Sequence, residues 1–377
     1  MRTLGRVRCA ILGARGLVAQ RLLERLANHH WLVPTHIYGS KESEGISVRE
    51  IPWSFNQPRP EFPDIIVREM GKSDELASEL ISQGVRIVFS ALPDFPASAI
   101  EEDLARSGLV VLSHSKIHRH SEMIPLIVPE VNADHLDLLD LQYEFGPGAL
   151  VACSNCMVVP LAVSLAPILR KFPVNSIHIS TEQSVSGAGR RILERYRDGV
   201  IPDPEIVGES ESVESELRRI LGRYEESGIN IAEIEIVAEC KRASREFGHS
   251  ASVTVELGKN TSAHEVIEAW SDFQSLVQHL DLPSGTKKPL IFVSDIGNSI
   301  SSLNPSDSRI LGEGQQKTME VSVGDVNVSG DKLCFKVASD NTVRGAAGNS
   351  VLLAEMMLAQ GIIHDLKNTL TPSQHVR

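Results

Sequence analysis

Short apolar runs alternate with segments of helical spacing in the first part of the chain. The runs lie at residues 7–13, 33–39, 65–67, 86–92 and 109–113, and the segments that predict helices lie at residues 17–28, 74–82 and 96–106. Leu17, Leu22 and Leu26 recur at the spacing of one helix face, which predicts that this face is buried. Buried strands alternating with helices are typical of a parallel, doubly wound sheet. We therefore expect an α/β fold.

The pattern changes after Cys153, where strand-like segments mix with longer helices. Strand-like segments lie at residues 176–181, 290–293, 319–323 and 333–337, and two more lie within residues 229–257. Helices are predicted to begin near Met157 and to span residues 262–280 and 346–360. The middle one begins with Ser262 and Glu265 at capping-box spacing. Without strict alternation, this half of the chain predicts a second, α+β domain.

Composition narrows the class of protein. The 377 residues are 42% hydrophobic and 23% charged, which excludes a disordered chain. The formal charge of −12, from 37 basic and 49 acidic residues, argues against a nucleic-acid or anionic-membrane surface, because phosphate affinity requires clustered cations. No stretch approaches the ~20 apolar residues of a membrane helix, and the N-terminus lacks a signal-peptide pattern. Five cysteines fit a reducing compartment, so we expect a cytoplasmic protein that handles small molecules.

A glycine-containing segment joins the first predicted strand to the first predicted helix. It runs from residue 13 to residue 19 and contains Gly13, Arg15, Gly16, Leu17 and Val18. Glycines at such a turn let the backbone approach a pyrophosphate, which the free N–H groups of the helix start then bind. A tight turn without a ligand would have the same sequence. Its place after the first strand of an alternating domain favours a dinucleotide-binding loop.

The end of the second predicted strand bears on the choice of cofactor. Ser40, Lys41 and Glu42 follow this strand, and none of them places an acid at its tip to hold the ribose 2′-hydroxyl of NAD. Ser40 and Lys41 suit the 2′-phosphate of NADP, and Arg15 adds a second cation. Glu42 opposes a phosphate, because like charges repel at short range. The balance favours NADP without excluding NAD.

Two nearby cysteines, Cys153 and Cys156, admit several kinds of site. A CxxC pair could be redox-active or half of a zinc site, but no second pair at zinc spacing is present, so we expect no metal. Cys156 could instead be a nucleophile at a helix N-terminus, where the dipole and the free amide groups lower the pKa of the thiol. A buried, inert cysteine is the remaining alternative.

A histidine and an arginine lie near the junction of two strand-like stretches. His249 could act as the base that a cysteine nucleophile needs, or it could be structural. Arg242 could bind a carboxylate through two parallel hydrogen bonds, or it could be a surface cation. Neither residue alone decides between these alternatives.

Taken together, the segments resemble aspartate-semialdehyde dehydrogenase, in particular the archaeal and fungal-type branch that is related to malonyl-CoA reductase. Six motifs carry the resemblance in family order, at residues 13–20, 128–132, 154–156, 181–189, 240–249 and 341–348. The resemblance implies a Rossmann-type cofactor domain formed by residues 1–152 and 341–377, because Asn341 must reach the nicotinamide. Residues 153–340 would form a central catalytic and dimerisation domain, which implies a homodimer or homotetramer.

The resemblance implies reductive dephosphorylation of L-aspartyl-4-phosphate by NADPH, which yields aspartate semialdehyde and phosphate. Cys156 would attack the acyl phosphate to form a thioester, and hydride transfer would reduce the thioester. His249 would serve as acid/base, and Gln183 would orient the acyl group. Arg242 would hold the substrate α-carboxylate, and Arg119 would take the phosphate.

The resemblance also implies contacts around the reacting groups. Glu209 falls in a region that contacts the amino and phosphate groups of the substrate. Ser186 and Gly187 would contribute to the cofactor site, and Asn341 would position the nicotinamide amide. These roles follow from matched motif positions alone.

Several residues near this site depart from the family pattern. Arg15 replaces a small hydroxyl residue of the glycine loop, His114 stands where an asparagine is usual, and Met157 follows the nucleophile where serine is common. Glu42 falls where the archaeal branch often has a basic residue. Ser212 falls at the apparent position of a lysine that is expected to meet phosphate.

These departures leave two alternatives open beside the main interpretation. One is a related acyl-phosphate or acyl-thioester reductase that acts on a different substrate. The other is a catalytically weakened paralogue retained for binding. The presence of Cys156, Gln183, Arg242 and His249 together favours catalysis, because binding alone does not require all four.

Overall fold

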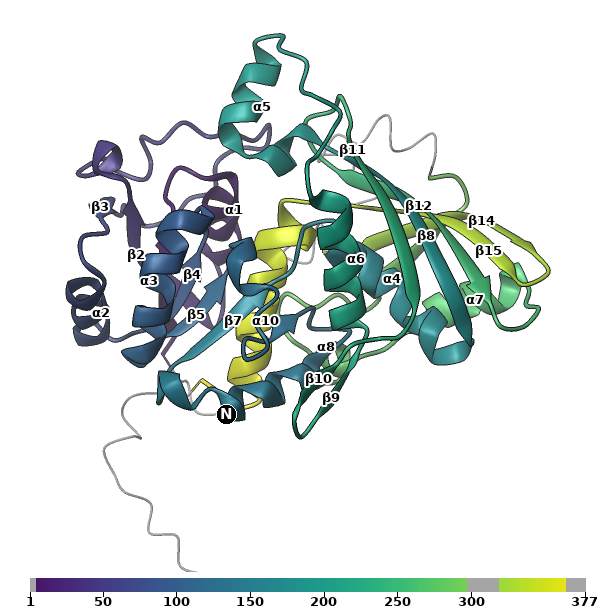
Figure 1. Ribbon diagram of the computed structural model, residues 1–377. Helices are drawn as coiled ribbons and strands as arrows, with labels where there is room; N and C mark the ends of the chain where they lie inside the picture. Colours follow the sequence, from purple (N-terminus) through teal and green to yellow (C-terminus); the bar gives the residue numbers. More distant parts are fainter. Residues whose placement is uncertain (1–4, 297–318, 364–377) are drawn as a thin grey trace, which may run out of the picture.

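Two large β-sheets organise the residues that the structure describes, which are 5–296 and 319–363 of a computed structural model (Figure 1). The first sheet lies at the left of Figure 1 and the second at the right, with helix α10 (Gly348–Ala359) between them. Both predicted classes are confirmed, since the first sheet is parallel and the second is mixed.

The first sheet has seven parallel strands in the order β3-β2-β1-β4-β5-β7-β6. Its strands are β1 (Val7–Leu12), β2 (Leu32–Gly39), β3 (Arg68–Glu69), β4 (Val85–Ser90), β5 (Val110–Ser113), β6 (Leu126–Ile127) and β7 (Ala149–Cys153). The strand order reverses between β1 and β4, and in open α/β sheets ligands bind in the crevice at such a switch point. The glycine segment lies there, at the carboxyl end of β1.

Helices cover both faces of this sheet. They are α1 (Leu17–Leu26), α2 (Ser73–Ser82) and α3 (Asp94–Arg106). Side chains of β1 alternate between the faces: Cys9 and Ile11 join the core formed with α1 and α10, whereas Ala10 and Leu12 join the core formed with α2 and α3. Burial on both faces explains why these strands appear as continuous apolar runs.

The last described helix, α10, returns to the first sheet from the far end of the chain. Val351, Leu352 and Met356 of α10 are completely buried in the core that also contains α1 and β1. The helix follows a π-helical turn at Val343–Ala347. Residues 1–4 and 364–377, which were predicted to belong to the cofactor domain, lie outside the described residues.

The second sheet has six strands in the order β11-β8-β12-β15-β14-β13. Its strands are β8 (Val174–Gln183), β11 (Glu235–Arg242), β12 (His249–Leu257), β13 (Leu290–Val293), β14 (Val321–Ser329) and β15 (Lys332–Ser339). The helices of this half are α4 (Val158–Lys171), α5 (Arg190–Arg197), α6 (Glu209–Ile220), α7 (Ala263–Ser271) and α8 (Leu276–His279). A small hairpin is formed by β9 (Arg223–Glu225) and β10 (Gly228–Asn230). Short 3₁₀ turns lie at Lys41–Ser43 (η1), Lys116–His118 (η2), Ala133–Leu141 (η3), Tyr143–Phe145 (η4) and Val185–Ala188 (η5).

Two predicted elements differ from the structure. The helix predicted at residues 262–280 is two helices, α7 and α8, because the Ser275 hydroxyl accepts the N–H of Val277 and starts a new helix. The strand predicted at residues 65–67 lies at Arg68–Glu69. Helix α6, at Glu209–Ile220, was not among the predicted elements.

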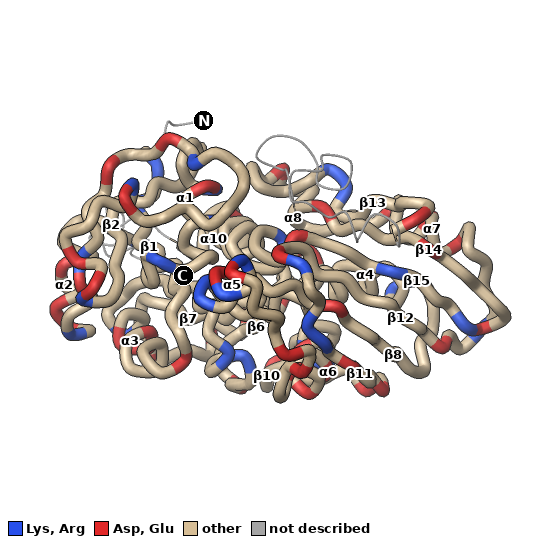
Figure 2. The backbone as a smooth tube through the Cα atoms, turned by 90° about the horizontal axis from the view of Figure 1, so that it is seen from above, with Lys and Arg blue, Asp and Glu red and all other residues tan. Residues whose placement is uncertain are grey.

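The charge of the chain is spread over the molecule. Figure 2 shows Lys and Arg interspersed with Asp and Glu along the backbone. Of the helices in the described parts of the chain, none is long and apolar enough to cross a membrane. Within the same residues, no group of three His, Cys, Asp or Glu side chains is arranged to hold a metal ion.

Candidate functional site

Cys156 lies in the short segment that joins β7 to α4. β7 ends at Cys153, and α4 begins at Val158 after Met157 at its N-cap position. The N–H of Met157 donates to the side-chain oxygen of Asn155 at 2.8 Å. The segment therefore leaves Cys156 partly accessible, whereas the side chain of Cys153 is buried.

His249, the first residue of β12, faces this cysteine. Its Nε2 lies 3.1 Å from Sγ of Cys156, and the backbone N–H of Ser184 donates to its Nδ1 at 3.0 Å. These two contacts hold the completely buried ring with Nε2 toward the sulfur. Burial, followed by the charges of Arg242 and Arg245, lowers the pKa of His249 well below its usual value, so the ring is neutral at pH 7.

The pKa of Cys156 differs from the expectation drawn from the sequence. Burial raises it to about 12, and the Glu209 carboxylate also raises it, against the lowering effect of Arg119 and Arg242. The predicted lowering by a helix N-terminus is therefore wrong for the protein on its own. The pKa of Cys156 is raised because the residue lies before the first residue of α4, in desolvated surroundings beside the Glu209 carboxylate.

Glu209, the first residue of α6, draws two further side chains to the cysteine. Its Oε1 accepts Nε2 of Gln183 at 2.8 Å and Nδ2 of Asn155 at 2.9 Å. Gln183 is the last residue of β8, so the end of this strand and the start of α6 meet beside Cys156. The structure thus brings together two residues that the sequence assigned separately to the acyl group and the substrate.

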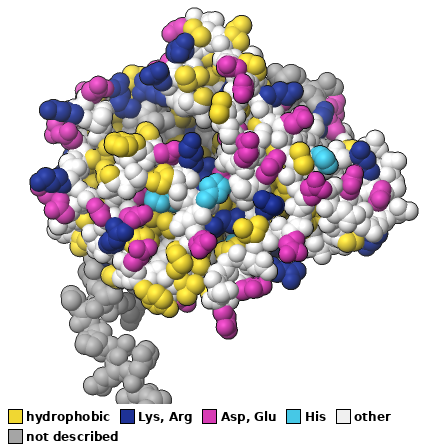
Figure 3. Space-filling model, in the orientation of Figure 1, with side chains coloured by type: hydrophobic (Ala, Val, Ile, Leu, Met, Phe, Trp, Pro, Cys, Tyr) yellow, Lys and Arg dark blue, Asp and Glu magenta, His cyan; other side chains and the backbone are white. Residues whose placement is uncertain are grey.

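Arg242, the last residue of β11, lines a pocket near the Cys156–His249 pair. Its NH1 donates to the carbonyl of Ser184 at 2.9 Å, and a Cβ on Gly187 would lie only 3.0 Å from this NH1. The pocket has a volume of about 270 Å³ and is also lined by α5 and by residues 200–205. Figure 3 shows a hollow on this face below α5, with cationic side chains beside it. A carboxylate in this pocket would meet the Arg242 guanidinium.

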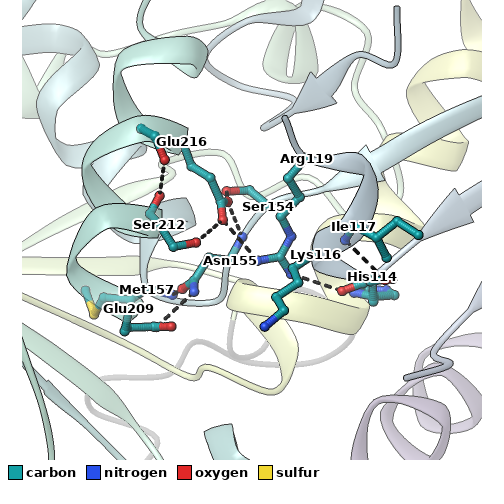
Figure 4. Close-up of polar contacts among 12 residues, drawn as sticks. His114, Lys116, Ile117, Arg119, Ser154, Asn155, Met157, Glu209, Ser212 and Glu216 are labelled. Carbon is teal, nitrogen blue, oxygen red and sulfur yellow. Dashed lines mark hydrogen bonds and ion pairs between the residues drawn. The ribbon is translucent and has the colours of Figure 1, made fainter. Parts of the chain in front are cut away.

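Arg119 lies beside Ser154 and Asn155 of the segment that carries Cys156 (Figure 4). Its NH2 donates to the carbonyl of His114 at 3.0 Å, and its NH1 donates to Glu216 at 3.1 Å. The ring of His114, which contacts the Ser350 hydroxyl, has its pKa lowered to about 3 by burial and by the charge of Arg119. The Arg119 guanidinium therefore lies among buried groups, and its charge lowers the pKa of Cys156.

Glu216 is a site residue that the sequence analysis did not select. It lies on α6 and is completely buried, and it contacts Arg119, Ser154 and the backbone of Asn155. The spacing of Glu209 and Glu216, seven residues apart, places both on one helix face. This spacing could have pointed to Glu216 from the sequence, but only once residues 209–220 are known to be helical.

Asn341 lies next to the histidine, far along the chain from the other site residues. Its Oδ1 accepts the N–H of Gly248 at 3.0 Å and the hydroxyl of Ser184 at 3.1 Å. Its Nδ2 donates to the hydroxyl of Ser186 at 3.0 Å. Asn341 and Ser186, both assigned to the cofactor from the sequence, are therefore neighbours beside the Cys156–His249 pair.

The glycine segment has the geometry of a phosphate-binding turn. Gly13 has a φ of +97°, which only glycine adopts without strain, and a Cβ there would lie 2.6 Å from the carbonyl oxygen of Ala91. Gly16 is the N-cap of α1, and no side chain caps that helix start. The N–H groups that begin with Leu17 and Val18 are thus available to an anion, so this chain fits the pyrophosphate of a dinucleotide.

Charged groups of both signs flank this turn. Arg15 and Glu42 form an ion pair of 3.9 Å, and both side chains are exposed. Ser40 and Lys41, at the end of β2, are also exposed. Arg15 therefore offsets the Glu42 carboxylate that would otherwise repel a 2′-phosphate.

Two family models match the chain over these same elements. The model described as "Semialdehyde dehydrogenase, NAD binding domain" matches residues 8–139, and the model described as "Semialdehyde dehydrogenase, dimerisation domain" matches residues 165–344. The chain belongs to the semialdehyde dehydrogenase family. The resemblance drawn from the six motifs is confirmed, and the family makes this protein an NAD(P)-dependent oxidoreductase.

Relatives of known name support the same family. An aspartate-semialdehyde dehydrogenase of Archaeoglobus fulgidus is 33% identical, with 94% of this chain and 98% of the relative covered. A malonyl CoA reductase (NADP) of Metallosphaera sedula is 31% identical, with 95% of this chain and 100% of the relative covered. The solved structure of aspartate semialdehyde dehydrogenase with NADP from Candida albicans has a TM-score of 0.78 and 26% identity, and the comparison covers 95% of this chain and 100% of that one.

Proposed function

We propose that this semialdehyde dehydrogenase family member catalyses the NADPH-dependent reductive dephosphorylation of L-aspartyl-4-phosphate to aspartate semialdehyde and phosphate. The observation that carries the proposal is the 3.1 Å contact between Sγ of Cys156 and Nε2 of His249, beside a pocket that contains Arg242. Archaeal and fungal relatives named aspartate-semialdehyde dehydrogenase support this choice of substrate.

The substrate would be held by groups on both sides of the sulfur. Arg242 would bind its α-carboxylate in the pocket, and the Glu209 carboxylate would bind its α-ammonium group. Gln183 would orient the acyl group through the amide that now bonds Glu209. Arg119 would receive the phosphate, since its guanidinium is joined through Glu216 to the segment that carries Cys156.

Covalent catalysis would begin at Cys156. Its sulfur would attack the acyl carbon, the bond from that carbon to the phosphate oxygen would break, and a thioester would remain. Nε2 of His249 is within hydrogen-bond distance of the sulfur and would exchange the proton during attack and release. The completely buried His249 ring beside the sulfur would help to keep water from the thioester before it is reduced.

NADP, which supplies hydride when reduced, is the proposed cofactor. Gly13, Gly16, Leu17 and Val18 would hold its pyrophosphate at the start of α1. Its 2′-phosphate would meet Ser40, Lys41 and Arg15 at the end of β2. Ser186, Gly187 and Asn341 would contact the nicotinamide beside His249. The NADP complex of the Candida albicans structure supports this choice.

We also infer the organisation and location of the protein. The cofactor domain would comprise residues 1–152 and 341–377, and the catalytic domain residues 153–340. A homodimer or homotetramer would form through the range that matches the dimerisation model. All five cysteines are free, which supports a reducing, cytoplasmic environment.

Reduction of an acyl thioester is the second candidate function. Ser212 contributes a hydroxyl where the resemblance places a cation for phosphate, and one relative is a malonyl CoA reductase. The reverse reaction distinguishes the two candidates. Aspartate semialdehyde and NADP are supplied with either inorganic phosphate or coenzyme A, and the formation of NADPH is followed. Turnover that requires phosphate supports the main proposal, and turnover that requires coenzyme A contradicts it.

A further inference from the structure

Glu216 accepts four hydrogen bonds at one side of the nucleophile segment (Figure 4). Its Oε2 accepts the hydroxyl of Ser154 at 2.9 Å and the backbone N–H of Asn155 at 2.8 Å. Its Oε1 accepts NH1 of Arg119 at 3.1 Å and the hydroxyl of Ser212 at 2.9 Å. The side chain is completely buried, so no solvent competes for these bonds. A single carboxylate therefore joins the cysteine segment to the arginine.

The bond to Asn155 bears on the position of the nucleophile. Asn155 directly precedes Cys156, and Glu216 holds its main chain while Glu209 holds its side chain at 2.9 Å. These two glutamates lie seven residues apart, which is about two turns of α6. Hydrogen bonds to a carboxylate are stronger than those between neutral groups, and their geometry is more restricted. Helix α6 thus holds both the main chain and the side chain of Asn155, the residue before the cysteine.

The bond to Arg119 bears on the anion that leaves the acyl carbon. The Arg119 side chain is only 12% exposed, and Glu216 and the His114 carbonyl hold NH1 and NH2. Its Nε is buried and has no hydrogen-bond partner among the described residues. A buried donor of this kind is costly without an acceptor, and an oxyanion beside Cys156 would supply one. Glu216 joins Arg119 to Asn155, the residue directly before Cys156, so an anion on Arg119 would lie near the sulfur.

The geometry points to Glu216 as a positioning residue that holds the Cys156 sulfur and the Arg119 guanidinium in a fixed relation around a departing oxyanion. The inference rests on the proposed function for the identity of that oxyanion, which is inorganic phosphate. Replacement of the carboxylate by an amide would place an N–H group against either the Asn155 N–H or the Arg119 guanidinium, since only one amide oxygen remains to accept. Glu216→Gln should therefore keep most of the side-chain volume but no longer hold Arg119 in place relative to Cys156.

Protection of Cys156 by phosphate tests this inference without substrate or cofactor. Iodoacetamide alkylation of Cys156 is followed by peptide mapping over a series of inorganic phosphate concentrations. In the wild type, phosphate should slow alkylation, because an anion on Arg119 covers the sulfur. In Glu216→Gln, the phosphate concentration for half-protection should rise roughly tenfold or more. Glu216→Asp keeps the charge but has a shorter reach, and it should also weaken protection.

The control is Glu211→Gln, an exposed glutamate on the same helix, which should protect like the wild type. In the reverse reaction, Glu216→Gln should raise the KM for phosphate by a similar factor and change the KM for semialdehyde less than twofold, because its contacts are with Arg119 rather than Arg242. Loss of thermal stability with unchanged phosphate protection would overturn the inference, as would a wild type that phosphate does not protect. Phosphate protection in a wild type that lacks NADP-dependent turnover would sustain the inference and reject the proposed function.

Discussion

Nε2 of His249 lies 3.1 Å from Sγ of Cys156, although 93 residues separate them along the chain. The contact joins the first residue of β12 to the segment between β7 and α4. Ser184 fixes the ring through its backbone N–H, and Asn341 contacts both Ser184 and the backbone beside the histidine. The catalytic pair therefore depends on segments from the whole length of the chain.

We predict that Cys156 is alkylated before Cys153. Burial raises the pKa of both thiols to about 12, so their accessibility decides which one reacts, and Cys153 is only 1% exposed. Mild iodoacetamide treatment of the native protein, followed by peptide mapping, should show modification at Cys156 first. Its rate should rise throughout the alkaline range as the thiolate forms. Earlier modification of Cys153, or a disulfide between the two in the native protein, would refute this assignment.

Replacement of Arg242 should weaken substrate binding. In Arg242→Lys, a point charge replaces the planar guanidinium, so two parallel hydrogen bonds to a carboxylate cannot form. The KM for aspartate semialdehyde in the reverse reaction should rise roughly 10- to 100-fold. Arg195→Lys, an exposed position in the same pocket, is the matched control and should change that KM much less. Equal effects of the two substitutions would show that Arg242 does not bind the carboxylate.

Preference for NADP should depend on Lys41. The exposed side chain of Lys41 lies at the end of β2, and Arg15 already offsets Glu42 through their 3.9 Å ion pair. In Lys41→Ala, the ratio of kcat/KM for NADP to that for NAD should fall, because the 2′-phosphate loses a cation. Glu42→Ala should raise the same ratio by removing a like charge. A wild type that prefers NAD, or a ratio that Lys41→Ala leaves unchanged, would contradict this prediction.

Buried neutral histidines should make the fold sensitive to acid. The pKa of His114 is lowered from 6.5 to about 3 in the folded protein, so between these values the unfolded chain binds a proton that the folded chain excludes. The free energy of unfolding should therefore decrease as the pH falls below about 6.5. His114→Asn removes one such group, and its unfolding free energy should fall less between pH 7 and pH 5 than that of the wild type. The unfolding free energies come from urea titrations, and an equal fall between pH 7 and pH 5 in the variant and the wild type would exclude this contribution.

Local patterns predicted most of the fold, and the resemblance named candidate site residues that the structure brings together. The apolar runs mark the buried strands, and the segments around Gly13 and Cys156 lie at the strand ends where an α/β sheet places its ligands. The prediction of one helix at residues 262–280 was wrong. The apolar spacing continues from α7 into α8, and the break between them depends on the Ser275 cap. Apolar periodicity carries no information about such a local hydrogen bond.

Long-range contacts explain what the sequence could not predict. Glu216 acquires its partners from the segment after β7, from the segment after β5 and from its own helix, and none of these is near in sequence except Ser212. The raised pKa of Cys156 likewise depends on burial and on Glu209, which the fold brings to the cysteine. Sequence spacing suggested a helix N-terminus at this position and did not reveal the carboxylate beside it.

The most direct test of the thioester mechanism is a reaction with phosphate withheld. The protein is mixed with aspartate semialdehyde and NADP, and NADPH is measured by absorbance while the protein mass is measured intact and after digestion. We predict one NADPH for each active site, an aspartyl adduct on Cys156 and no adduct in Cys156→Ser, with continuous turnover once phosphate is added. Absence of both the burst and the adduct, or continuous turnover without phosphate, would contradict the account.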